Sequence, residues 1–70
     1  HAQALAERLR QRVRALRAAA GLSLEALAAR SGVSRSMIPL VERGETSATA
    51  VVLDKLATGL GVPLASLFDT

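Results

Sequence analysis

Apolar residues recur every three or four positions along most of the chain, a spacing that predicts amphipathic helices. The first segment places on one stripe the residues Leu5, Leu9, Val13, Leu16 and Ala20. Later segments repeat the spacing and are separated by glycine, which commonly ends a helix in a left-handed conformation. We expect five helices, over residues of about 4–20, 24–31, 35–43, 49–60 and 63–68. The predicted fold class is therefore all-α, a compact five-helix bundle that forms one domain over residues 1–70.

The second and third predicted helices begin with the same signal and are joined at one glycine. Ser23 and Ser34 each stand where a side-chain oxygen can accept a hydrogen bond from the first free backbone N–H groups of a helix. Gly32, between the two helices, can turn the chain with positive φ at little cost. These features predict a helix-turn-helix over about residues 24–43. Its outer face carries Arg35, Ser36, Pro39, Leu40 and Arg43.

Pro39 conflicts with a regular helix over residues 35–43. With Ser34 as the cap, Pro39 is the fifth residue, where it has no N–H for the Arg35 carbonyl and its ring crowds that group, at a cost of about 3 kcal/mol. Either the helix is kinked, or it begins near Ser36, which places Pro39 in the tolerated first turn. Both alternatives move Arg35 and Ser36 on this face.

The net charge of the chain favours negatively charged partners but does not distinguish between their kinds. Nine Lys and Arg residues against six Asp and Glu give a formal net charge of +3. Such a balance favours polyanions, which include nucleic acid, a membrane surface and an acidic protein. A lipid-bound helix needs bulky apolar residues and preferably aromatic ones, and single-stranded RNA binding needs stacking aromatics. The chain has one Phe and no Tyr or Trp, which disfavours both of these partners.

The sequence lacks the residues that several other classes of function require. Cys is absent and the single His is His1, so we expect no zinc site, no other metal and no thiol or histidine catalysis. The sequence offers no paired carboxylates and no phosphate-cradling glycine loop, so we expect no enzyme and no cofactor. No apolar run reaches the roughly 18 residues of a membrane span. We therefore expect a soluble, cytoplasmic protein.

Four motifs in a fixed order resemble the phage-repressor and Cro-like (Xre) helix-turn-helix regulators. They are R-x-L-R-x-x-x-G-L-S from Arg14 to Ser23, L-A-x-x-S-G-V-S from Leu27 to Ser34, E-R-G at Glu42 to Gly44, and L-G-V-P-L-x-x-L-F from Leu60 to Phe68. The resemblance covers about residues 9–68 and implies a lambda-repressor-like DNA-binding bundle. Within the family, SRSMI, ERGE and TAVVLDKLATGLGV are similar to the subgroup in which a ligand-sensing cupin barrel follows the DNA-binding domain.

The resemblance implies that the third helix enters the major groove of duplex DNA and that its first residues read bases. Arg35 can hold guanine O6 and N7 with two hydrogen bonds, Ser36 can bond either kind of base edge, and Leu40 can contact a thymine methyl. Pro39 lies among these three residues. Family members usually carry a polar residue at this position, so Pro39 is expected to weaken or retune base reading.

The resemblance also implies a set of phosphate contacts, which fix register and carry little sequence information. The candidates are Ser23, Ser34, Arg43, Thr46, Ser47 and Thr49. Three of them, Ser23, Ser34 and Thr49, can instead be helix caps only. Separately, the resemblance implies a buried ion pair between Arg17 and Glu42 that joins the first and third helices.

Two kinds of partner remain open from the sequence. Members of the family usually bind duplex DNA as homodimers that read two half-sites about one helical turn apart. The resemblance to the cupin-bearing subgroup further implies a C-terminal sensor domain that is missing from this sequence. In the alternative interpretation, the same helices form a protein-interaction module without DNA reading, and the basic charge only maintains solubility.

Overall fold

The chain folds into five helical segments in a computed structural model that describes residues 2–46 and 48–68, and the side chains of residues 6–46 and 48–68. The segments are α1 (Ala2–Ala19), α2 (Leu24–Ser31), α3 (Met37–Arg43), α4 (Ala50–Leu60) and η1 (Leu64–Phe68). The described residues contain no strand, which confirms the all-α prediction. The expectation of five α-helices is wrong, because η1 is a 3-10 helix of five residues. So short a segment favours the tighter i→i+3 pattern, and the Ser66 N–H bonds the Pro63 carbonyl at 2.9 Å.

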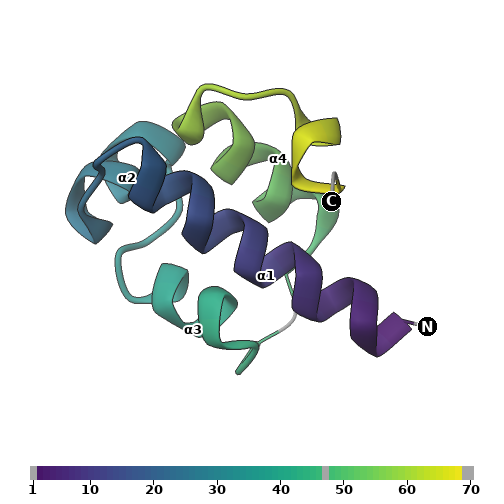
Figure 1. Cartoon of the computed structure of the whole chain (residues 1–70). Helices are drawn as coiled ribbons and strands as arrows, with labels where there is room; N and C mark the ends of the chain where they lie inside the picture. The colour runs from purple at the N-terminus through teal and green to yellow at the C-terminus, as the bar shows by residue number, and fades with distance from the viewer. Residues whose placement is uncertain (1, 47, 69–70) are drawn as a thin grey trace.

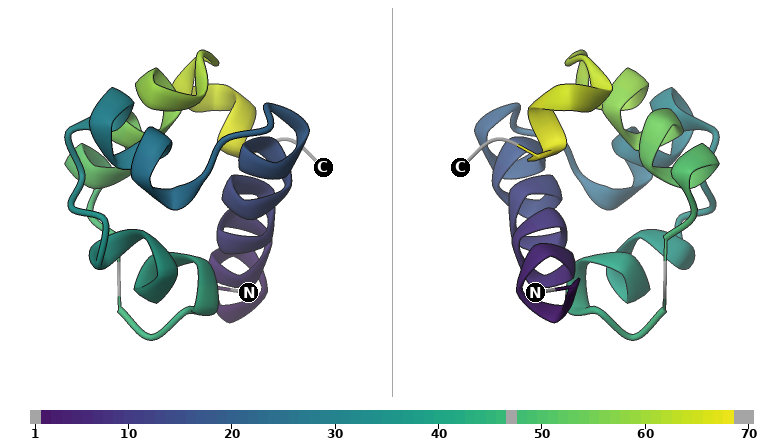
Figure 2. Two further views of the ribbon diagram at one scale, coloured as in Figure 1. Left: turned by 90° about the vertical axis from the view of Figure 1, so that its left-hand side faces the viewer. Right: turned by 90° about the vertical axis from the view of Figure 1, so that its right-hand side faces the viewer.

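The long helix α1 separates the other elements into two groups (Figure 1). In that view α3 lies below α1, whereas α4 and η1 lie above it, and the turned views of Figure 2 agree. The contacts of α1 are accordingly with α3 on one side and with α4 and η1 on the other. Helix α2 packs mainly against α4 and touches α3 less extensively. As a result α3 keeps a face that no other described helix covers.

Each of the five segments contributes one large, fully buried side chain to a common core. These side chains are Val13, Leu27, Ile38, Leu56 and Leu67, in chain order from α1 to η1. Burying a side chain of this size stabilises the fold by about 1.5–3 kcal/mol relative to leaving it in water. The apolar stripe predicted from the sequence is therefore the means by which all five segments pack together.

The element boundaries follow local signals closely. Ser23 accepts a hydrogen bond from the Ala26 N–H at the start of α2, and Thr49 accepts one from the Val52 N–H at the start of α4. Gly32 ends α2 with a φ of 76°, as expected from its place between the helices. The first helix spans Ala2–Ala19 instead of about 4–20, and Ala20, expected on the inner stripe, is exposed in the turn that follows.

One glycine allows α2 and α4 to approach closely. A Cβ atom built at Gly59 would lie 2.7 Å from the Ser31 Cβ and 3.0 Å from the Leu27 Cδ1. Ser31 is itself buried, and its hydroxyl accepts a hydrogen bond of 3.1 Å from the Val33 N–H. The backbone of α4 therefore rests against α2, which fixes where α2 and the following turn lie.

Candidate nucleic-acid interface

The chain before α3 forms a turn that leaves Arg35 and Ser36 exposed. The Ser34 hydroxyl accepts a hydrogen bond from the Met37 N–H at 3.2 Å, and the Ser34 carbonyl accepts one from the same group at 3.0 Å. Arg35 and Ser36 make up this turn, and regular α-helix begins at Met37. The third helix thus begins two residues later than the expected range of 35–43. The structure has the second of the two alternatives for Pro39, since this residue is the third of α3.

The physical reason for the late start is the missing N–H of Pro39. That group would have bonded the carbonyl of Arg35 and carried the helix back to it. In the first turn of a helix, N–H groups have no partner inside the helix, so the same proline costs little there. Pro39 therefore sets the start of α3, and Arg35 lies before the regular helix.

The two faces of α3 differ sharply in burial. Ile38, Val41 and Glu42 are buried against the rest of the protein. Arg35 and Ser36 are exposed just before the helix, and Pro39 and Leu40 are half-buried on it. The four residues expected to read bases thus lie along one short stretch of chain. The two polar ones are the more accessible to a partner.

Arg35 is joined to α2 by an ion pair. Its Nε donates a hydrogen bond of 3.2 Å to the Oε2 of Glu25, in the first turn of α2. The pKa of Glu25 is held below its usual value, first by a hydrogen bond from the backbone N–H of Glu25 itself and then by the Arg35 guanidinium. This contact brings the first turn of α2 next to the turn that precedes α3.

The residues expected to contact phosphate fall into two groups at opposite ends of α3. Ser23 is the N-cap of α2, whereas Ser34 lies in the turn before α3 and accepts from the Met37 N–H, the N-cap of α3 being Ser36. Arg43 is the last residue of α3, Thr46 lies in the chain after it and Thr49 precedes α4, while Ser47 lies outside the described residues.

The Arg17–Glu42 ion pair joins α1 to the end of α3. Arg17 donates from Nε at 2.8 Å and from Nη2 at 3.0 Å to the two carboxylate oxygens of Glu42. Its Nη1 donates to the Leu22 carbonyl at 3.1 Å. The Glu42 hydrogen bond raises the pKa of Arg17 and outweighs the opposing effect of burial. The two-pronged contact holds α3 in place on α1 from its inner side.

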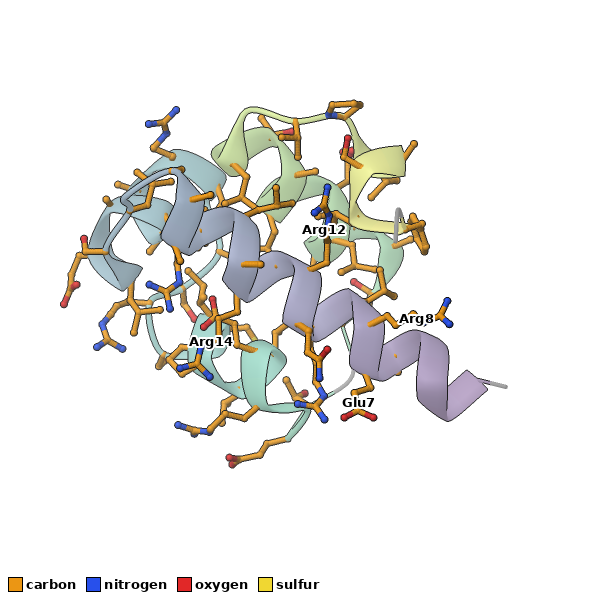
Figure 3. All side chains as sticks on the ribbon, in the orientation of Figure 1. Glu7, Arg8, Arg12 and Arg14 are labelled. Atoms are coloured by element: carbon orange, nitrogen blue, oxygen red, sulfur yellow. The ribbon has the colours of Figure 1, made fainter. Side chains whose placement is uncertain are left out.

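The arginines of α1 do not form one solvated face, as Figure 3 shows. Arg12 lies on the side of α1 toward η1, where its Nε donates to the Ser66 carbonyl at 3.0 Å. Arg14 lies on the side toward α3, and Arg8 points away from α3. Arg10 crosses to the end of α3, where a Cβ at Gly44 would lie 2.9 Å from its Nε.

Sequence reasoning missed three residues that matter for this surface. Glu25 holds Arg35, and Ser31 and Gly59 set the approach of α2 to α4. Gly59 does carry a sequence signal, because a glycine inside a helical pattern often marks a packing requirement. Glu25 carries a weaker one, since an acid in a first helical turn is already favoured by the helix dipole. Pairing it with Arg35 needs the folded chain.

Neither a metal centre nor a membrane span is found in the part of the chain that the structure describes. No cluster of three or more His, Cys, Asp and Glu side chains there could hold a metal ion. No helix among those residues is long and apolar enough to cross a membrane.

Comparison with known proteins gives one family and two informative relatives. A family model described as helix-turn-helix matches residues 13–67. The HTH-type transcriptional regulator SutR of Escherichia coli (strain K12) is 44% identical over 65 residues, which is 93% of this chain and 36% of SutR. The chain thus spans about a third of the length of this curated relative. The crystal structure of the restriction-modification controller protein C.AhdI from Aeromonas hydrophila matches with a TM-score of 0.84 and 43% identity, over 97% of this chain and 100% of that one.

Proposed function

The chain belongs to the helix-turn-helix family, and on that premise we propose that it binds duplex DNA sequence-specifically as a transcriptional regulator. Two similar proteins, a transcriptional regulator and a controller protein, support this role. In the proposed complex α3 and the turn before it enter the major groove, while α2 crosses the DNA backbone. The proposed protein binds DNA without catalysing a reaction, and its proposed location is the cytoplasm.

The observation that carries the proposal is the exposed turn between two packed helices. The inner side of α3 is buried, through Ile38 and Val41, so the helix is held rigidly. The turn before it leaves Arg35 and Ser36 exposed. A rigid helix preceded by exposed donors is what base reading in the major groove requires, because each donor must meet a base edge within hydrogen-bond distance.

We assign base reading to four residues of this stretch. Arg35 binds guanine O6 and N7, and Ser36 bonds a base edge of either kind. Leu40 contacts a thymine methyl with its half-buried side chain. Pro39 acts indirectly, because its missing N–H sets where α3 begins and hence where Arg35 stands.

Phosphate binding is assigned to the groups at both ends of α3. Ser23 and Ser34 bind beside the first backbone N–H groups of their helices, where the helix dipole favours an anion. Arg43, Thr46 and Thr49 bind on the other side of the base readers, and Ser47 is proposed as a further phosphate contact. Capping and phosphate contact are compatible, since a hydroxyl that accepts from a backbone N–H can still donate its own proton to a phosphate oxygen.

The active form is proposed to be a homodimer on two half-sites about one helical turn apart. The large apolar side chains that stay exposed among the described residues, Val51 at 64% and Phe68 at 48%, lie on α4 and η1, which pack against each other. They are the candidate dimer contacts, and sedimentation equilibrium of wild type and Val51→Asp tests this. We also propose a C-terminal sensor domain, on the resemblance to the cupin-bearing subgroup.

The test of DNA binding is a titration with random-sequence duplex DNA across a series of salt concentrations. If the dimer neutralises about six phosphates, log affinity falls against log salt with a slope near −5 or steeper. Arg43→Ala should weaken binding to all sequences alike and make the slope shallower. Arg8→Ala removes the same charge from the side of α1 that faces away from α3, so it is the matched control.

Two outcomes of this titration would contradict the proposal. Absence of binding at low salt would favour a protein-interaction module, in which the same helices serve only as a platform. Equal effects of Arg8→Ala and Arg43→Ala would show attraction to net charge without a defined phosphate site. A selection from random duplexes then gives the preferred operator sequence.

A further inference from the structure

The arginine proposed to read guanine already has a carboxylate partner in the free protein. Arg35 and Glu25 are ten residues apart and lie on opposite sides of the turn at Gly32. The distance from Arg35 Nε to Glu25 Oε2 is 3.2 Å, with side chains that are 49% and 72% exposed. The pair therefore sits on the surface that the base readers share, where its strength depends on geometry more than on burial.

The atom that Glu25 engages leaves the reading end of Arg35 available. A guanidinium has five N–H donors in a planar fork, and Nε lies on its side edge. Guanine O6 and N7 require two parallel donors, which Nη1 and Nη2 at the end of the fork can supply. A carboxylate on Nε and a guanine on the terminal nitrogens can thus be bound at the same time. Glu25 restricts the orientation of the fork without competing for the same donors.

We propose that Glu25 is a positioning residue for Arg35 and thereby determines how strongly the protein prefers guanine at the base that Arg35 contacts. The inference rests on the proposed DNA-binding function. Glu25 orders the Arg35 side chain before DNA arrives, so less rotamer freedom is lost when the two hydrogen bonds to guanine form. A base other than guanine at this position gains nothing from the ordering of Arg35, because it cannot accept both hydrogen bonds.

The same carboxylate has an opposite effect on binding that is independent of sequence. Its negative charge lies near the path of the DNA backbone and weakens attraction to any duplex. Its pKa is lowered, so Glu25 stays ionised at neutral pH and both effects operate there. The proposal therefore has a distinctive signature. Loss of Glu25 should keep or raise the affinity for random DNA and lower the preference for guanine.

Arg43 and Glu45 offer a matched control on the same protein. Arg43 Nε also donates to a carboxylate, that of Glu45, and both side chains are exposed. Arg43 is assigned to a phosphate, which carries no sequence information. Glu45→Ala should therefore change the affinity for all duplexes by one factor and leave the guanine preference as it is.

The experiment uses the duplex that wild type selects from a random pool. Dissociation constants are measured for that duplex, for variants that replace each guanine in turn, and for random duplex. For Glu25→Ala we expect the guanine preference to fall about threefold and at most about fivefold, because an exposed ion pair contributes little to an equilibrium. Glu25→Gln should fall between wild type and Glu25→Ala, because its amide oxygen can still accept from Nε.

A second measurement does not need DNA. Relaxation of the Arg35 Nε–H group, followed by nuclear magnetic resonance in the free protein, should report an ordered side chain in wild type and a mobile one in Glu25→Ala. Equal mobility in the two proteins would overturn the proposal. The proposal would also be overturned if wild type binds its selected site and Glu25→Ala shows the same guanine preference as wild type. If wild type binds no duplex, the proposed function fails and this inference with it.

Discussion

Replacing Glu42 by Ala tests the ion pair that fastens α3 to α1. The carboxylate side chain is 7% exposed and the Arg17 side chain 19%, so both charges are largely removed from water. After Glu42→Ala, the Leu22 carbonyl at 3.1 Å is what remains of Arg17's hydrogen-bond partners in the wild-type structure. Breaking one side of such a pair costs about 3–5 kcal/mol, because it leaves a buried charge uncompensated.

A loss of this size is a large fraction of the stability of a domain of 70 residues. At about 0.05–0.15 kcal/mol per residue, the whole fold is worth roughly 4–10 kcal/mol. Since about 1 kcal/mol shifts the midpoint of a small domain by about 4–8 °C, we expect Glu42→Ala to lower Tm by at least about 12 °C. Thermal unfolding followed by circular dichroism measures this directly.

Two further variants separate the ion pair from a general loss of charge. Glu7→Ala removes an exposed carboxylate that pairs with Arg10 at 3.4 Å, and it should cost no more than about 1 kcal/mol. The double variant Arg17→Met with Glu42→Leu fills the site with apolar groups and should recover the wild-type Tm or exceed it. The reasoning is refuted if the Tm of Glu42→Ala equals that of wild type or that of Glu7→Ala.

Three more predictions follow from individual contacts. Gly59→Ala should lower Tm despite the better helix propensity of Ala, because the new Cβ would lie 2.7 Å from the Ser31 Cβ; a raised Tm would contradict the close packing. Pro39→Ser should change the free energy of unfolding by less than about 1 kcal/mol in urea titration but alter affinity for the selected duplex; an unchanged affinity would contradict the role given to Pro39. Arg35→Ala should raise the pKa of Glu25 only part of the way to its usual value, since the backbone hydrogen bond remains, and carboxyl chemical shifts followed against pH measure it. Because the pKa of Glu25 is lowered on folding, the pair stabilises the fold at pH values above the usual Glu pKa, and this contribution is lost as pH falls through the lowered pKa. A Glu25 pKa that Arg35→Ala leaves unchanged would contradict the pairing.

The elements that could be predicted are those whose signals lie within about one helical turn of each other. The serine cap of α2, the threonine cap of α4 and the left-handed Gly32 all act between residues no more than four positions apart. The inward stripe followed from the same short spacing, and Val13 is fully buried as the pattern indicated. The resemblance added the partnership of Arg17 with Glu42, which spacing alone could not have suggested.

The start of α3 shows where local signals compete. A cap at Ser34 and a proline five residues later favour different helix starts, and sequence reasoning left both open. In the structure both signals operate, since the Ser34 hydroxyl accepts from the Met37 N–H while regular helix begins only at Met37. The last segment shows a similar limit, because apolar spacing over Leu64–Phe68 does not distinguish a 3-10 helix from an α-helix.

By itself, then, the sequence determined the four α-helices to within about two residues, the caps of α2 and α4, and the helix-turn-helix, because backbone hydrogen bonds and apolar stripes are short-range features of a chain. Only the tertiary structure decided which surface side chains meet. Glu25 reaches Arg35 because two helices fold across Gly32, and Gly59 matters because α4 lies against α2. Such contacts depend on the angle and distance between helices, which many side chains set jointly and no short motif encodes. The exposure of Arg35 and Ser36 could be predicted from the chain, whereas the pairing of Arg35 with the Glu25 carboxylate could not.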